Sequence, residues 1–174
     1  SLDSKYYIEQ DESFAIAGDK NSVVRTIGVK VADKNLADVN EVWAQDEIDD
    51  GQAPDGTSAN DPKLDDDGNQ IVTKGLKTLA KEKADVNANS LLDGFNWLIA
   101  RKVTADTAIP SAVATYMAAV RTAHASICTA IDNASDIDAF KVLHTTEYNE
   151  DGSVKTIAKV NDWPDDSGVK GNRR

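Results

Sequence analysis

Cysteine, histidine and methionine are scarce in this chain of 174 residues, which contains one cysteine, two histidines and one methionine. Because Cys128 is the single cysteine, no disulfide bond can form within the chain. No cysteine or histidine spacing typical of zinc ligands is present either. This usage fits a reducing cytoplasm, and we expect no cofactor and no metal-ligating residues.

Long apolar runs are also missing. No stretch approaches the roughly 20 consecutive apolar residues that a membrane-spanning helix needs. The first residues, SLDSKYY, lack the basic region followed by an apolar run that is typical of a signal peptide. We therefore expect neither secretion nor insertion into a membrane.

Basic charge is in short supply, and the deficit is confined to the first part of the chain. The sequence has 30 Asp plus Glu against 19 Lys plus Arg, a formal net charge of -11. Residues 1–70 account for all of it, with 17 acidic and six basic side chains, whereas residues 71–174 have 13 of each. Such a chain approaches nucleic-acid phosphates or an anionic membrane against net repulsion, so we expect neither as the main partner.

Signatures of common enzyme classes are absent as well. The chain contains no G-x-S-x-G, no G-x-x-x-x-G-K-[ST] and no G-x-G-x-x-G. His124 and Cys128 are four residues apart in a predicted helix, a spacing that can bring a nucleophile pair together, but no oxyanion donor or third orienting group accompanies them. We predict no catalytic residues and a non-enzymatic protein, with a His124–Cys128 enzyme as the weakest alternative.

We predict an α+β fold, with the strands in the first part of the chain. Within residues 1–45, runs rich in β-branched and aromatic residues predict two or three strands, KYYIEQ, SFAIA and SVVRTIGVKV. After them, Leu36, Val39 and Trp43 stand near helical spacing, which allows a short helix within residues 34–48.

Residues 46–70 form an acidic segment that we interpret as a solvated loop or linker. Nine carboxylates lie between Asp46 and Asp67, together with two prolines and two glycines, and Lys63 is the only basic residue there. Placing Gly68 at position six of an EF-hand loop puts lysines at positions one and twelve, where ligands are required, so that motif is excluded. A looser divalent-cation site stays open, with Asp49, Asp50, Asp61 and Asp66 as its carboxylates.

Residues 71–164 are expected to form a helical-hairpin domain. After a turn at Asp67-Gly68 and a brief strand, a first helix is predicted from about Lys74 to Val103. Its apolar residues recur at intervals that fit one face: Leu76, Leu79, Val86, Leu91, Phe95, Leu98 and Val103. Gly94 and the asparagines of DVNANS are poor helix-interior residues, so we expect a break or kink there.

The second helix of the predicted hairpin has the clearest periodicity. Pro110 is expected at its first position, where a missing N–H is tolerated. Its apolar face repeats at intervals of three and four residues: Val113, Tyr116, Met117, Val120, His124, Ile127 and Ile131. The short connection makes the two helices antiparallel neighbours that bury their apolar faces against each other.

Shorter elements are expected after the hairpin. Ser135 or Asp136 can cap a third helix, IDAFKVL, which supplies Phe140, Val142 and Leu143 as apolar side chains. Asp151-Gly152 lies between two runs of alternating character and predicts a β-hairpin. Residues 165–174 form a polar tail that we expect to be disordered unless a partner holds it.

Large amphipathic side chains provide the candidates for partner binding. We select Trp97, Tyr116, Arg121, Trp163 and Pro164, because aromatic residues and arginine are enriched at protein interfaces. The alternative for Trp97 and Tyr116 is that they seal the core of the helical hairpin.

Residues 97–164 resemble the tail fibre assembly proteins, also called tail assembly chaperones, of tailed bacteriophages. The residues that carry the resemblance are Trp97 in WLIARKV, Ile109-Pro110 before the second helix, YMAAVR with Tyr116 and Arg121, and Trp163-Pro164 in NDWP. The family has a variable β-rich first part, a long helix, a turn before a proline, a second helix with a tyrosine, and a Trp-Pro near its end.

The resemblance implies a non-enzymatic phage protein that binds other phage structural proteins. It would act as a tail or fibre assembly factor or as a minor component of the tail, fibre or capsid, and would lie in the virion or, during assembly, in the host cytoplasm. Its partners would be tail, fibre or capsid proteins, with homo-oligomerisation left open. The alternative function is a divalent-cation-binding accessory domain organised by the acidic loop.

Overall fold

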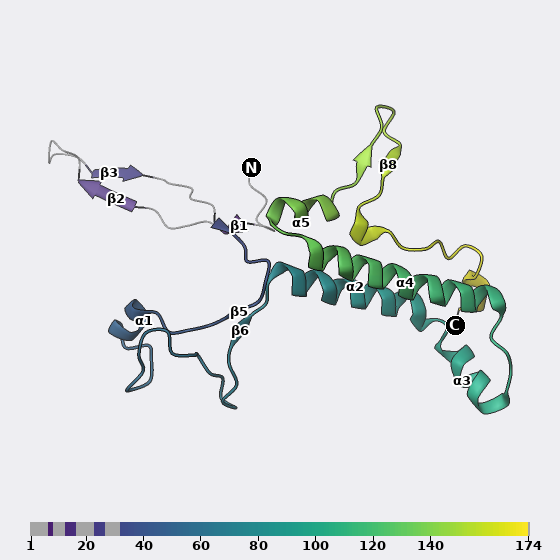
Figure 1. The fold of residues 1–174 in the computed structure, drawn as a ribbon, viewed down its shortest axis with the longest axis horizontal. Helices are drawn as coiled ribbons and strands as arrows, with labels where there is room; N and C mark the ends of the chain where they lie inside the picture. The colour runs from purple at the N-terminus through teal and green to yellow at the C-terminus, as the bar shows by residue number, and fades with distance from the viewer. Residues whose placement is uncertain (1–6, 9–12, 17–22, 27–31, 174) are drawn as a thin grey trace. The chain divides into compact units, whose positions relative to one another are not determined.

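The computed structural model describes residues 7–8, 13–16, 23–26 and 32–173 (Figure 1). The chain divides into two compact units, residues 1–76 and residues 77–174. Its elements are short antiparallel strand pairs and helices, so the fold is α+β as predicted.

Short strands in the first unit confirm the predicted β character. β1 (Tyr7–Ile8) pairs antiparallel with β4 (Ala32–Asp33). β2 (Ser13–Ile16) pairs antiparallel with β3 (Val23–Thr26) as a hairpin. The other residues of the three predicted strand runs lie outside the described residues.

The prediction of a short helix within residues 34–48 is wrong for most of that range. Val39 belongs to β5 (Val39–Asn40), which pairs antiparallel with β6 (Val72–Thr73), and only α1 (Gln45–Asp49) is helical. Strand pairing with a distant segment therefore prevails over a weak helical periodicity. The backbone at Gly75 passes close to the backbone at Ala37. A Cβ atom at Gly75 would lie 2.3 Å from the carbonyl carbon of Ala37, so a larger residue cannot be accommodated without movement.

The acidic segment is a loop, as expected, but it is folded rather than a free linker. The amide of Lys63 donates to the carbonyl of Glu41 at 2.9 Å, and the amide of Ile71 donates to the carbonyl of Lys63 at 2.8 Å. A carboxylate oxygen of Asp65 accepts backbone N–H groups of Asp67 at 3.0 Å and Asn69 at 2.8 Å and so closes the predicted turn.

Two antiparallel helices form the frame of the second unit (Figure 1). The predicted first helix is divided into α2 (Leu76–Asp93) and α3 (Asn96–Ala105), with the break at Gly94 and Phe95, where it was expected. The second is α4 (Ser111–Asn133). Lys81 near the start of α2 and Asp132 near the end of α4 form an ion pair at 2.8 Å, which shows the antiparallel arrangement.

The start of α4 differs slightly from its prediction. Pro110 is the N-cap residue rather than the first helical residue, because its ψ of 135° is extended. The carbonyl of Pro110 still accepts the amide of Ala114 at 3.0 Å, so the proline opens the helix in either description.

The core of the second unit confirms the apolar face of α4 and corrects that of α2. Val113, Tyr116, Met117, Val120, Ile127 and Ile131 are all buried. On α2, Leu76, Ala84 and Ala88 are buried, whereas Leu79 is 48% exposed and Val86 is 66% exposed. Ala88 packs into the same buried cluster as Val113, Tyr116, Met117 and Val120 of α4.

The elements after α4 follow the prediction with one exception. Asp136 caps α5 (Ile137–Leu143) by accepting the amide of Ala139 at 2.8 Å. Phe140 is buried, but Val142 is 68% exposed and does not join the core. The predicted hairpin consists of β7 (Glu147–Tyr148) and β8 (Val154–Thr156).

Residues 165–173 pack against the helices, which corrects the expectation of a disordered tail for these residues. After the 3-10 helix η1 (Lys159–Asn161), a second short helix, η2 (Lys170–Asn172), lies within residues 165–173. Val169, the single apolar residue in this stretch, is only 4% exposed. In the described part of the chain, no helix combines the length and apolarity needed to cross a bilayer.

Candidate partner-binding site

A cluster of aromatic rings marks the end of the helical pair where α2 meets α3. Phe95 is fully buried and packs edge-on against Tyr116, with ring centroids 5.7 Å apart and planes at 62°. Phe95 reaches this position because the helix breaks at Gly94 and Phe95, which lets its side chain enter the core from the bend. Val169 packs into the same cluster.

Trp97 lies at the edge of this cluster. Its ring is half-buried, and its indole N–H donates to the backbone carbonyl of Asn172 at 3.0 Å. The guanidinium of Arg101, one turn further along α3, lies 6.0 Å from the ring centroid, at the outer limit of a cation–π contact. Trp97 thus joins α3 to the segment at residues 165–173.

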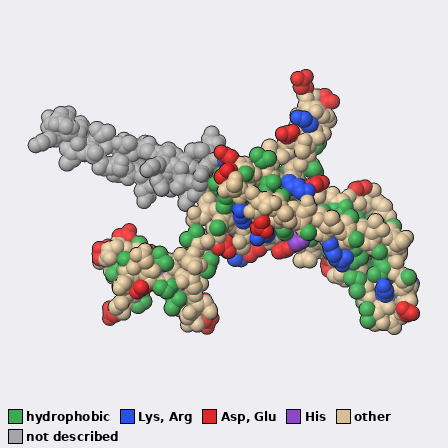
Figure 2. Space-filling view, viewed as in Figure 1, with side chains coloured by type: hydrophobic (Ala, Val, Ile, Leu, Met, Phe, Trp, Pro, Cys, Tyr) green, Lys and Arg blue, Asp and Glu red, His purple; other side chains and the backbone are tan. Residues whose placement is uncertain are grey.

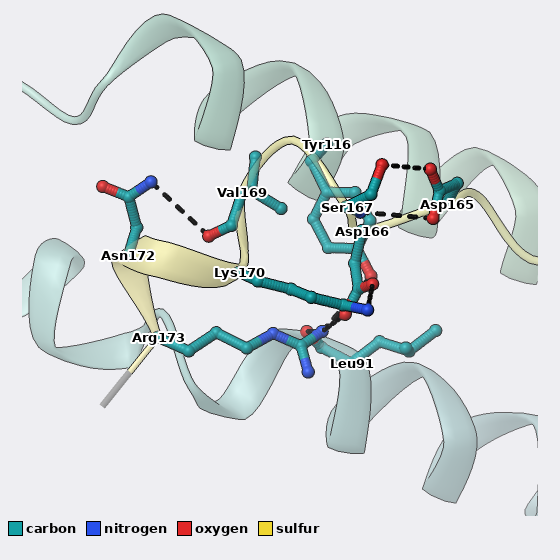
Figure 3. Close-up of polar contacts among 9 residues, drawn as sticks. All are labelled: Leu91, Tyr116, Asp165, Asp166, Ser167, Val169, Lys170, Asn172 and Arg173. Atoms are coloured by element: carbon teal, nitrogen blue, oxygen red, sulfur yellow. Dashed lines mark hydrogen bonds and ion pairs between the residues drawn. The ribbon is translucent and has the colours of Figure 1, made fainter.

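Arg173 holds that segment against the helices (Figure 3). Its guanidinium lies 3.1 Å from a carboxylate oxygen of Asp166, and its Nη2 donates to the carbonyl of Leu91 at 3.3 Å and to the hydroxyl of Tyr116 at 3.5 Å. The same guanidinium stands 5.3 Å from the ring centroid of Phe95. One side chain therefore contacts α2, the bend and α4.

The segment also makes its own turn before η2. The hydroxyl of Ser167 donates to the carboxylate of Asp165, and the amide of Ser167 donates to it at 3.2 Å. These hydrogen bonds lower the pKa of Asp165, the hydroxyl contact having the larger effect. Asp166 pairs with Lys170 at 3.2 Å as well as with Arg173.

Trp163 and Pro164 border open grooves. The indole N–H of Trp163 donates to the carbonyl of Val160 at 3.2 Å, and the half-buried ring packs against the aromatic cluster. Trp163 and Pro164 line a groove of about 410 Å³ whose α4 side is formed by Ala119, Thr122, Ala123 and Ser126. On its other side, Trp163 lines a groove of about 300 Å³ with Asn87, Ser90 and Leu91 of α2.

The structure brings together three of the five candidate residues. Trp97, Tyr116 and Trp163 meet in one cluster, and Pro164 adjoins it through the groove. Tyr116 is 6% exposed, so it serves the core, as the alternative had it. Arg121 is exposed on α4 and lines neither of these grooves.

The sequence did not reveal Asp166, Val169 and Arg173, which together attach residues 165–173 to the aromatic cluster. They lie in a stretch whose composition is typical of disorder, and the one signal was Val169 as a lone apolar residue among polar ones. A single buried valine and a multiply bonded arginine order the stretch.

His124 and Cys128 are in contact on α4, as their spacing of four residues allows. The Nε2 atom of His124 lies 2.6 Å from Asp85 and 3.5 Å from the sulfur of Cys128, so both neighbours compete for one ring nitrogen. Burial raises the pKa of the Cys128 thiol, and the nearby carboxylate of Asp85 raises it further. A cysteine nucleophile needs a lowered pKa instead.

The carboxylates of the acidic loop serve its turns. Hydrogen bonds, the one from the amide of Asn69 above all, lower the pKa of Asp65. Among residues that the structure describes, no three His, Cys, Asp or Glu side chains gather as a set of metal ligands. The loop therefore lends no support to the divalent-cation alternative.

Trp97 and Trp163 are thus half-buried aromatic side chains at the edge of one hydrophobic cluster. Comparison of the chain with protein-family models, with curated proteins and with solved structures found no match.

Proposed function

We propose that this chain is a non-enzymatic bacteriophage protein that binds other phage structural proteins. It acts as a tail or fibre assembly factor or as a minor virion component associated with the tail, fibre or capsid. The proposal rests on the resemblance of residues 97–164 to tail fibre assembly proteins. The structural observation that supports it most is apolar surface left open on α3.

Two apolar side chains of α3, Ile99 and Val103, lie on one face of that helix and are exposed. Val103 is 81% exposed and Ile99 is 39% exposed, and residues four apart in a helix are neighbours on its surface. Figure 2 shows apolar side chains gathered on the helix that Figure 1 labels α3. Exposed apolar surface of this kind is typical of protein interaction sites.

Charge supports the same class of partner. The acidic first part of the chain repels nucleic acid and anionic membranes, whereas it leaves contacts with proteins free. We accordingly place the protein in the virion or, during assembly, in the host cytoplasm, with tail, fibre or capsid proteins as partners and self-association as a further possibility.

The first test is whether the chain is present in purified phage particles. Mass spectrometry of intact particles that shows it at a fixed copy number supports the virion component, and detection only in the infected-cell lysate together with a bound tail, fibre or capsid protein supports the assembly factor. If it copurifies with no phage structural protein in either sample, the proposed function is wrong.

Substitutions on α3 test the surface itself. Ile99→Ser with Val103→Ser should weaken copurification of the phage partner at least about tenfold, because the partner loses apolar contact area. Val142→Ser is the matched control, since Val142 is equally apolar and 68% exposed but lies on α5. Equal loss in both variants, or no loss in the α3 variant, would assign the partner surface elsewhere.

A further inference from the structure

Residues 165–173 lie on the helical unit in the manner of a bound peptide. Most of their side chains are exposed, whereas Val169 is buried and Asp166 and Arg173 are partly buried. Their backbone N–H groups donate within the segment, as at Val169 to Asp166, at 2.9 Å. The segment thus forms its own short turns and contacts the helices through a few anchoring groups.

The surface beneath is shaped for these anchors (Figure 3). The cluster around Phe95 and Tyr116 buries Val169, and the indole N–H of Trp97 binds the backbone carbonyl of Asn172. At Gly94, an added Cβ atom would lie 3.0 Å from Cγ of Arg173, so the absence of a side chain leaves room for the arginine stem. The surface therefore buries a valine, donates a hydrogen bond to a backbone carbonyl and accepts hydrogen bonds from a guanidinium.

The segment fills this surface imperfectly. The hydrogen bonds from Arg173 to Leu91 and Tyr116 are long, at 3.3 and 3.5 Å, against a usual value of about 2.9 Å. The Nε atom of Arg173 is buried and has no hydrogen-bond partner among the residues that the structure describes, which is unfavourable. A segment that satisfied these groups better would compete with residues 165–173 for the surface.

We propose that the Phe95–Trp97–Tyr116 surface is a peptide-binding site, filled by residues 165–173 of the chain itself and open to exchange with a partner segment of the same chemistry. That segment carries a small aliphatic residue followed four positions later by an arginine, as Val169 and Arg173 do. The identity of the partner as a phage structural protein rests on the proposed function, whereas the peptide chemistry rests on the contacts of the site.

The test measures peptide binding to full-length chains in which the site has been opened. Val169→Asp removes the buried anchor, and Arg173→Ala removes the guanidinium but keeps the valine. The probe is a synthetic fluorescein-labelled peptide of residues 165–173, DDSGVKGNR, and the readout is fluorescence anisotropy. Helix content measured by circular dichroism shows that each variant is folded.

The peptide should bind both variants at least about tenfold more tightly than it binds the wild-type chain, whose own segment competes at a high effective concentration. A control peptide with alanine in place of its arginine should bind the opened chains at least about tenfold more weakly. No binding to a folded Arg173→Ala chain, or equal binding of the two peptides, would overturn the proposal.

Two further outcomes show what occupies the site and distinguish failure of the peptide-binding proposal from failure of the proposed function. A wild-type dimer in size-exclusion chromatography that is lost in Val169→Asp would mean that segments are exchanged between two copies, which overturns a separate partner protein. Peptide binding by a chain that copurifies with no phage protein supports the site while refuting the proposed function.

Discussion

The acidic loop at residues 46–70 and the segment at residues 165–173 are both polar and rich in carboxylates, yet they are ordered by different interactions. No residue of the acidic loop is buried, and its turns are closed by backbone hydrogen bonds and by the carboxylate of Asp65. The second segment buries Val169 against a hydrophobic cluster and inserts Arg173 among backbone and aromatic groups. Carboxylates close turns in both segments, but only the second segment also has a buried apolar anchor, Val169.

This difference predicts which perturbation should affect each segment. A loop closed by carboxylates responds to protonation, because a neutral carboxyl group accepts hydrogen bonds less strongly. A segment anchored by a valine responds to loss of that side chain, because the stabilisation comes from the apolar area that is removed from water.

The largest expected effect comes from Val169→Asp, which should release residues 165–173. The variant loses burial of a valine side chain, about 2 kcal/mol, and would otherwise have to bury a carboxylate. We expect the Tm of the helical unit to fall by roughly 8 °C, measured by circular dichroism. Limited trypsin digestion should at the same time cleave after Lys170 at least about tenfold faster.

Lys170→Gln is the matched control for Tm, because Lys170 is an exposed neighbour of Val169. Its Tm should stay within about 1 °C of the wild-type value, as is usual for surface substitutions. A Val169→Asp chain with an unchanged Tm would show that the segment adds nothing to the stability of the helical unit.

A smaller effect is expected on acidification. The pKa of Asp65 is lowered, so the turn that it closes is fully stabilised above the ordinary pKa of an aspartate, about 3.9, and loses that stabilisation as pH falls through the lower folded value. Hydrogen-exchange protection of the Asp67 and Asn69 amides should therefore decrease on going from pH 5 to below pH 4. The pKa of Asp165 is lowered as well, so the turn that it closes before η2 should weaken over the same range.

Asp65→Asn separates the titration of this carboxyl from other effects of acid. The amide oxygen of asparagine still accepts hydrogen bonds but does not titrate in this range. Protection of the Asn69 amide in this variant should be weaker at pH 5 and nearly independent of pH. An equal loss of protection in variant and wild type would trace the acid response to other carboxylates.

The smallest effect is expected from Gly94→Ala at the bend between α2 and α3. The added methyl group meets the stem of Arg173 at 3.0 Å, and a flexible side chain can move by a few tenths of an ångström to accept it. We expect a two- to threefold increase in the trypsin cleavage rate after Lys170, with little change in Tm. Cleavage as fast as in Val169→Asp would mean that the arginine cannot adjust.

Much of the helical unit could be predicted because its signals are local. The apolar repeat of α4, the cap at Asp136 and the break near Gly94 each depend on neighbouring residues and were confirmed. The exposure of Leu79 and Val86 could not be predicted in this way, because periodicity records which residues are apolar but not which side of the helix meets the rest of the unit.

The candidate site was predicted in part. Trp97 and Trp163 were selected by residue type and do meet in the structure, and Tyr116 joined the core. Arg173 escaped notice because its effect comes from contacts with residues more than 50 positions earlier, Leu91 and Tyr116. Val169 is buried in a cluster built by distant residues, and Asp166 acts through its ion pair with Arg173. Composition cannot reveal contacts of that range.

The bend at Phe95 separates a more buried part of the long helical segment from a more exposed part. Packing against α4 is concentrated before and at the bend, whereas α3 beyond it buries Leu98 and displays most of its remaining side chains. Substitutions at the outward positions of α3 should therefore change the surface of the protein with little effect on its melting behaviour.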